Sequence, residues 1–137
     1  MSSVMQRMQS RTFRRSIVVL YTIGLLIATL SPLPSTSYDA VRGIDKLVHV
    51  VLFGGLSAVL YWVGLSGTWR AMGTGVAIAI ATAGLIEILQ GLLAYRSADG
   101  MDFVAGSIGA VVGVGAATGM GQVWSRLLVH RKCSEPS

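Results

Sequence analysis

The stretch AGSIGAVVGVGAATGMG, residues 105–121, has no charged side chain and places a small residue at every fourth position. The repeat consists of Ala105, Gly109, Gly113, Ala117 and Gly121. Residues four apart lie on one face of an α-helix, so these positions form a stripe that lets another helix approach closely. The charge-free run from Phe103 to Ser125 is also long enough to cross a bilayer. The stretch therefore predicts a closely packed transmembrane helix.

Three further apolar segments precede this one. They cover about residues 16–34, 47–66 and 71–95, and the segment quoted above extends over about 102–128. Each has close to the roughly 20 apolar residues that a spanning helix needs. The 137-residue chain is 53% hydrophobic and only 12% charged, with a mean hydropathy of +0.66. The sequence thus predicts an all-α polytopic membrane protein in which four transmembrane helices form a bundle.

Basic residues predict the orientation, because Lys and Arg in short loops are enriched on the cytoplasmic side. One side carries Arg7, Arg11, Arg14, Arg15, Arg70, Arg126, Arg131 and Lys132, and the other carries Arg42, Lys46 and Arg96. We therefore expect a basic cytoplasmic segment at residues 1–15, a four-helix domain at 16–128 and a short cytoplasmic tail at 129–137. A cleaved signal peptide at the N-terminus is the alternative, and it would leave three spans.

A second stripe of small residues, Gly75, Ala79 and Ala83, lies in the third apolar segment. Continuing it by four residues leads to Glu87, so this acid is expected to face another helix and not lipid. We expect both stripes to pack within one chain. Association of two chains through the glycine-rich helices, giving a homo-oligomer, is the alternative.

Polar residues gather near one end of these segments. They are Asp45, Lys46 and His49 in the second segment, Glu87 and Gln90 in the third, and Arg96, Asp99 and Asp102 before and at the start of the fourth. An acid within a span costs about 2.5 to 3.5 kcal/mol to insert, so Glu87 is expected to have partners or a function. We predict that the eight side chains form one binding site that opens at the outer face.

Helical spacing predicts how members of this set pair. The Asp45 carboxylate is four residues before His49 and is expected to set the imidazole tautomer. If the second and third helices are adjacent, His49 is expected to reach Glu87. Gln90 follows Glu87 by three residues, so both are expected to address one neighbour. Each residue also has a structural interpretation: Asp99 and Asp102 suit helix caps, and Arg96 suits an interfacial charge.

The order and spacing of these motifs resemble the VanZ-like family of small bacterial membrane proteins. The resemblance rests on Asp45-Lys46-x-x-His49, Glu87-x-x-Gln90 and Arg96-Ser-Ala-Asp99-x-x-Asp102 before a glycine-rich span, and it covers roughly residues 30–121. It implies a multi-pass protein of the bacterial cytoplasmic (inner) membrane. The family namesake is associated with low-level resistance to the glycopeptide teicoplanin, but the resemblance implies no particular reaction.

One position departs from the family pattern. The family often has an Asn four residues after the second Asp, whereas this chain has Gly106, followed by Ser107. Any role of that Asn amide is therefore expected to be absent or to have passed to Ser107.

The sequence favours binding over catalysis. The expected ligand is a membrane lipid headgroup, a lipid-linked envelope precursor or a glycopeptide moiety, held by cations and oriented by acids. An intramembrane hydrolase is one alternative, with Glu87 or Asp102 as base, His49 as acid and a metal held by His49, Glu87 and Asp102 as one version. Because no HExxH, GxSxG or other recognised ligand spacing occurs, the sequence assigns no metal and no cofactor. A structural scaffold is the other alternative.

Three further classes of function are disfavoured. The net charge of +5 follows from residues at the predicted cytoplasmic ends of the spans, so it indicates topology and not nucleic-acid binding. A single cysteine excludes an intramolecular disulfide or a cysteine-based metal cluster. Transport of protons would need a relay across the membrane, yet the segment from Ala71 to Ile86 has no ionisable group.

Overall fold

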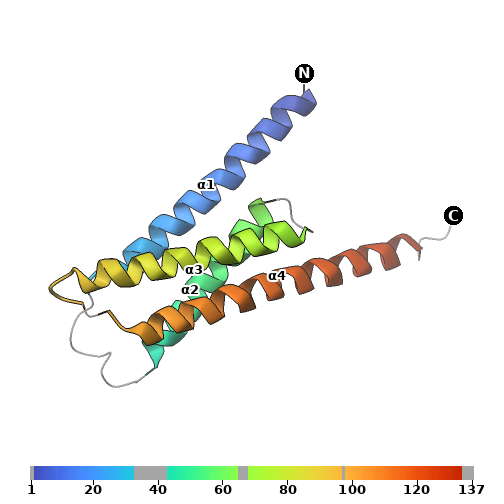
Figure 1. The fold of residues 1–137 in the computed structure, drawn as a ribbon. Helices are drawn as coiled ribbons and strands as arrows, with labels where there is room; N and C mark the ends of the chain where they lie inside the picture. Colours follow the sequence, from blue (N-terminus) through green and yellow to red (C-terminus); the bar gives the residue numbers. More distant parts are fainter. Residues whose placement is uncertain (1, 33–42, 65–67, 97, 134–137) are drawn as a thin grey trace.

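Four α-helices make up the protein in its computed structural model, which describes residues 2–32, 43–64, 68–96 and 98–133. The helices are α1 (Ser2–Leu30), α2 (Ile44–Val63), α3 (Trp69–Gly91) and α4 (Gly100–Cys133). No strand occurs among those residues, and all four helices are long and apolar enough to cross a membrane. The predicted four-helix transmembrane bundle is confirmed (Figure 1).

The helix boundaries differ from the predicted ones by two to five residues, except at the start of α1, which lies 14 residues before the predicted start of the first span. Helix α1 already begins at Ser2, and α2 begins at Ile44, directly after Gly43, whose φ of 112° is in the left-handed region. Helix α3 ends at Gly91, earlier than predicted, because Leu92 and Leu93 donate to carbonyls three residues back and tighten the chain into a turn. The predicted ends at Pro34 and Ser66, the loop residue Arg42 and the last four tail residues lie outside the described residues.

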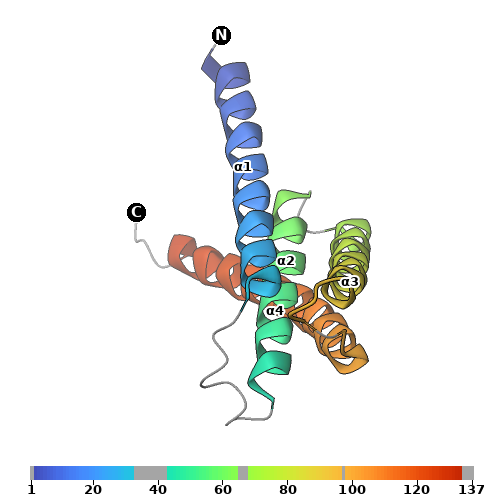
Figure 2. The ribbon, with the colours of Figure 1, turned by 90° about the vertical axis from the view of Figure 1, so that its left-hand side faces the viewer.

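The helices run alternately up and down, and α2 lies in the middle of the bundle (Figures 1 and 2). Helix α2 contacts α1, α3 and α4, and α3 also contacts α1 and α4. The ends of α1 and α3 and the beginnings of α2 and α4 therefore share one end of the bundle, which we call the polar end because the polar residues of the three later segments lie there. The start of α1 and the end of α4 lie toward the opposite end (Figure 1).

Glycines bring α2 and α4 into backbone contact. A Cβ atom on Gly109 would overlap the backbone of Val50, and one on Gly113 would overlap the backbone of Gly54. Ser57 strengthens the same contact, since its Oγ donates to the Ala110 carbonyl of α4 at 2.6 Å. The first half of the predicted stripe is thus used within the molecule, whereas a Cβ on Gly121 would meet nothing within 4 Å.

The stripe on α3 is buried as far as Glu87. Gly75, Ala79 and Ala83 are all buried, and a Cβ on Gly75 would lie 3.1 Å from the Ser57 carbonyl oxygen of α2. The four-residue spacing therefore placed Glu87 inside the bundle, as predicted.

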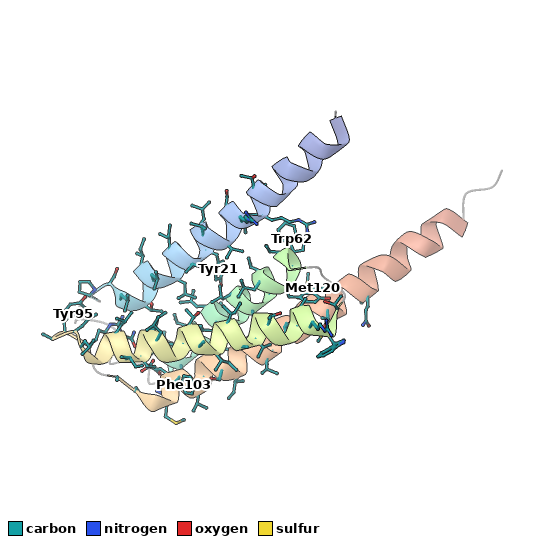
Figure 3. The ribbon with its side chains drawn as sticks, turned by 45° about the horizontal axis from the view of Figure 1, so that its top comes forward. Tyr21, Trp62, Tyr95, Phe103 and Met120 are labelled. Carbon is teal, nitrogen blue, oxygen red and sulfur yellow. The ribbon has the colours of Figure 1, made fainter. Side chains whose placement is uncertain are left out.

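Helix α1 packs on α2 and α3 with a polar anchor at its centre. The Tyr21 hydroxyl donates to the Leu52 carbonyl at 2.9 Å, and its ring lies over Gly55 (Figure 3).

The outer surface of the helices is apolar. Large apolar side chains such as Leu20 and Ile88 face outward, at 68% and 65% exposure. An exterior of this kind is unfavourable in water and suits contact with lipid. The arrangement supports a multi-pass membrane protein.

Candidate binding site at the polar end of the bundle

Six polar side chains meet at the polar end, and we call them the polar cluster. They are Asp45, Lys46 and His49 of α2, Glu87 of α3, Asp99 of the connection before α4 and Asp102 of α4. They converge because α2 and α4 begin at the same end of the bundle at which α3 ends (Figure 1). These residues are spread over more than 50 positions of the chain, so only the packing of the helices brings them together.

Lys46 joins the two aspartates at the start of α4. Its Nζ lies 2.9 Å from Asp99 Oδ2 and 3.3 Å from Asp102 Oδ1. The Asp102 side chain is 5% exposed, whereas the Lys46 side chain is 40% exposed, so the ammonium group lies at the mouth of the cluster. The positive charge of Lys46 is therefore already shared between two carboxylates.

Asp99 orders the start of α4. Its Oδ1 accepts from the Met101 amide at 2.9 Å and its carbonyl accepts from the Asp102 amide at 2.8 Å, as expected of a helix cap. Its own amide donates to Glu87 Oε2 at 3.0 Å. The hydrogen bond from Lys46, followed by that from the Met101 amide, lowers the pKa of the Asp99 carboxyl below its ordinary value of 3.8.

This lowered pKa predicts an acid-sensitive contribution to stability. A carboxyl whose pKa falls on folding stabilises the protein above its unfolded pKa, and that contribution is lost as the pH falls through the lower folded value. Replacing Asp99 with Asn keeps the oxygen that caps α4 but removes the charge. We expect the unfolding temperature of the wild type in detergent to fall more steeply below pH 3.8 than that of Asp99→Asn. Parallel curves for the two proteins would contradict the role given to the Lys46 pair.

The position of the His49 ring sets its tautomer. Its Nδ1 lies 2.9 Å from the Asp45 backbone carbonyl and 4.0 Å from the Asp45 carboxylate. A carbonyl oxygen only accepts, so Nδ1 carries a proton and the neutral ring has a free lone pair on Nε2. The tautomer of His49 is thus set by the backbone carbonyl of Asp45 and not, as predicted, by the Asp45 carboxylate.

His49 and Glu87 face each other without a hydrogen bond. His49 Nε2 lies 3.7 Å from Glu87 Oε1, and the two side chains are 3% and 11% exposed. Among the described residues neither atom has a hydrogen-bond partner. Buried polar atoms are rarely left in this state, since each loses its water without replacement. The pair is therefore the part of the polar cluster whose hydrogen-bonding capacity is not used by the described residues.

Gln90 and Arg96 are directed at α1 and not at the polar cluster. Gln90 Nε2 donates to the Thr29 carbonyl at 2.8 Å, and Arg96 Nη2 lies 3.4 Å from the Ser31 carbonyl. The Tyr95 hydroxyl donates to the carbonyl of Leu30, the residue between Thr29 and Ser31, at 3.0 Å (Figure 3). The last carbonyls of a helix lack partners within it and attract positive charge, so these three side chains cap α1. Glu87 and Gln90 therefore address two different neighbours.

A comparison with protein families matches residues 2–122 to VanZ/LLP1. The chain belongs to the VanZ/LLP1 family. The family resemblance predicted from the motifs is thereby confirmed. Searches among curated proteins and among solved structures found no match.

Phe53 packs against Gly106, the position at which the family resemblance led us to expect an Asn. Phe53 is fully buried and stacks on His49, with ring centroids 5.8 Å apart. A Cβ on Gly106 would lie 2.8 Å from the Phe53 ring, so an Asn at position 106 would displace that ring. Ser107 does not replace the amide at the polar cluster, because its hydroxyl donates to the Phe103 carbonyl of its own helix at 2.8 Å.

No motif in the sequence pointed to Phe53. Its spacing of four residues from His49 in an apolar helix is the signal that would have found it, because residues four apart share a face. In this VanZ/LLP1 chain, Phe53 holds the inner side of the imidazole and leaves the edge with Nε2 toward Glu87.

Three members of the polar cluster also form a set of metal-ligating groups. One ring nitrogen of His49 and one carboxylate oxygen each of Asp45 and Asp102 lie within 4.8 Å of one another. Two of these residues are in α2 and the third is in the first turn of α4, so the set does not form a local motif in the VanZ/LLP1 sequence. Imidazole and carboxylate ligands together suit divalent cations such as Zn²⁺ and Mn²⁺.

Proposed function

We propose that this VanZ/LLP1 protein binds, at its polar cluster, the polar headgroup of a membrane lipid or of a lipid-linked envelope precursor. The proposal rests on His49 Nε2 and Glu87 Oε1, which have no hydrogen-bond partner among the described residues. Two buried acceptors that face each other can be satisfied by donor groups of a ligand. Hydroxyl and amine groups of a headgroup are such donors. Lys46 at the mouth is placed to meet a headgroup on entry.

The proposed site opens toward the outer face of the bacterial cytoplasmic membrane. Eight of the eleven Lys and Arg residues belong to the predicted cytoplasmic side, and the polar end belongs to the other side. With four spans, both termini are then cytoplasmic. A lipid can reach the polar cluster sideways from the outer leaflet, because large apolar side chains such as Leu47 and Met101 beside it are exposed. A glycopeptide that recognises envelope precursors would compete for the same ligand, which is how a role in teicoplanin susceptibility would arise.

Native mass spectrometry of the purified protein tests headgroup binding. We expect the wild type to retain a lipid that is lost in His49→Ala and Lys46→Met. Ser107→Ala is the matched control, since it removes a polar group from α4 that bonds within its own helix, and it should retain the lipid. In a deletion strain, His49→Ala and Lys46→Met should fail to restore the wild-type lipid profile and the wild-type level of teicoplanin susceptibility. Equal retention by all four proteins, each folded, would refute the proposal.

An intramembrane hydrolase is the second candidate. The observation in its favour is the His49 tautomer, because a ring whose Nδ1–H is held by a carbonyl presents Nε2 as a base beside two acids, Glu87 and Asp102. Incubation of the purified protein with the retained lipid separates the two candidates. Release of the headgroup by the wild type but not by His49→Ala would establish catalysis.

A further inference from the structure

The polar cluster holds more negative charge than its own cation balances. Four carboxylates gather there, those of Asp45, Glu87, Asp99 and Asp102, against one ammonium group that two of them already share. Asp102 and Glu87 are buried, with only 4% and 8% of the whole residue exposed. Carboxylates that are crowded together in a buried site require a proton or a cation between them.

The free imidazole nitrogen shows where a cation fits. Nδ1 is occupied by the Asp45 carbonyl, so Nε2 is the nitrogen with an available lone pair. Glu87 Oε1 faces it at 3.7 Å, too far for a hydrogen bond between the two atoms. Two ligands about 2.1 Å from a tetrahedral zinc ion lie about 3.4 Å apart, so a small shift of either side chain admits a metal between them.

We infer that the polar cluster binds one divalent transition-metal cation, Zn²⁺ or Mn²⁺, between His49 Nε2 and Glu87 Oε1, with the carboxylate of Asp102 as a third ligand and a further position open. One carboxylate oxygen of Asp102 lies within 4.8 Å of a His49 ring nitrogen, so a shift of the side chain brings this acid to an ion beside the ring. The hydrogen bond that Nδ1 donates to the Asp45 carbonyl is the outer contact that orients a ligating imidazole. Phe53 packs against the ring and restricts its rotation.

Such an ion would change what the proposed headgroup site can recognise. Without it, the polar cluster is net negative and repels a phosphate. With it, the ion offers open positions to phosphate oxygens, as divalent cations do in many phosphate sites. The inference rests on the proposed function in assigning ligand binding to this cluster, and it adds phosphate-bearing lipids as the ligand class.

Metal titration without added lipid tests the inference separately. The chain has one other histidine, His130, and one cysteine, Cys133, so the double variant His130→Ala/Cys133→Ser serves as the background and removes rival ligands. The protein is stripped with a chelator, loaded with Zn²⁺ or Mn²⁺ and desalted, and bound metal is measured by mass spectrometry. We expect about one ion per chain and a rise in unfolding temperature. Co²⁺ should give visible absorption bands that report nitrogen and oxygen ligands.

Ligand variants decide where the ion binds. In the same background, His49→Ala and Asp102→Asn should each weaken metal binding by more than tenfold and remove the Co²⁺ bands, whereas Ser107→Ala should change neither. Asp102→Asn keeps the volume of the side chain and answers the question if His49→Ala does not fold. Absence of bound metal in the background protein, or unchanged affinity in Asp102→Asn, would overturn the inference. Lipid retention without metal would leave the proposed headgroup site standing, and metal binding without lipid retention would leave only the metal site.

Discussion

Replacing Gly109 with Leu is expected to separate α2 from α4 and to prevent a stable bundle. A Cβ at this position would fall on the Val50 backbone, which cannot rotate away as a side chain can. Overpacking a core commonly costs about 1 to 3 kcal/mol, and a clash with backbone belongs above that range. The contacts of Lys46 with Asp99 and Asp102 join α2 to the start of α4, so they should be lost as well.

Thermal unfolding in detergent, followed by tryptophan fluorescence and size-exclusion chromatography, measures this effect. Gly115→Leu is the matched control, because it makes the same change in α4 at a position where a Cβ would meet nothing within 4 Å. We expect Gly115→Leu to behave like the wild type and Gly109→Leu to aggregate or unfold at a much lower temperature. Similar unfolding temperatures for the two variants would mean that the glycine contact between α2 and α4 is not what holds the bundle.

Replacing Glu87 with Gln is expected to abolish ligand and metal binding while leaving the fold at least as stable. The amide oxygen of Gln can accept from the Asp99 amide as Glu87 Oε2 does. The amide nitrogen can donate to His49 Nε2, which in the wild type has no partner among the described residues. A new buried hydrogen bond is worth about 1 kcal/mol, and the cost of a buried charge disappears.

The comparison with Glu87→Leu makes this prediction specific. Leu cannot accept from the Asp99 amide, so this variant should lose about 1 to 3 kcal/mol of stability for the unpaired donor. The expected order of unfolding temperature is therefore Glu87→Gln at or above wild type, and Glu87→Leu below it, with both variants failing to bind metal and lipid. If Glu87→Gln were clearly less stable than the wild type, the carboxylate charge would itself hold the fold, as it would beside a protonated His49.

A gain in stability in Glu87→Gln would indicate that the polar cluster is built to bind a ligand and not to stabilise the fold. Groups that bind ligands are often left unsatisfied in the free protein, and replacing them then stabilises the fold at the expense of function. The pair of His49 and Glu87 has this character, whereas Ser57 and Tyr21 have their hydrogen bonds completed inside the bundle.

Much of the fold could be predicted because the relevant physics is local. The lack of charge between Phe103 and Ser125 defines a span, and the four-residue spacing of Gly109 and Gly113 defines its packing face. The same spacing on α3 led from Ala83 to the buried Glu87. The predicted end of α3 was four residues too late, because the chain turns after Gly91 although it stays apolar as far as Tyr95.

The candidate site was less predictable from the sequence. Helical spacing put Gln90 beside Glu87, but three residues turn a helix by about 60° short of a full circle, and that angle is enough to direct Gln90 to Thr29 of α1. Arg96 is likewise directed to α1, since its Nη2 lies 3.4 Å from the Ser31 carbonyl oxygen. Which neighbour stands on each side of α3 is a property of the bundle and not of the segment.

The sequence by itself determined the four spans, the faces on which they pack and the family to which the chain belongs, because length, hydropathy and residue spacing act along one helix at a time. Only the tertiary structure decided that His49 Nε2 and Glu87 Oε1 face each other at 3.7 Å, with Asp45 and Asp102 beside them. That arrangement depends on the close approach of α2 to α4 over Gly109 and Gly113 and on the position of α3 beside both. Distances between helices follow from how three surfaces pack at once, and no single stretch of sequence contains that information.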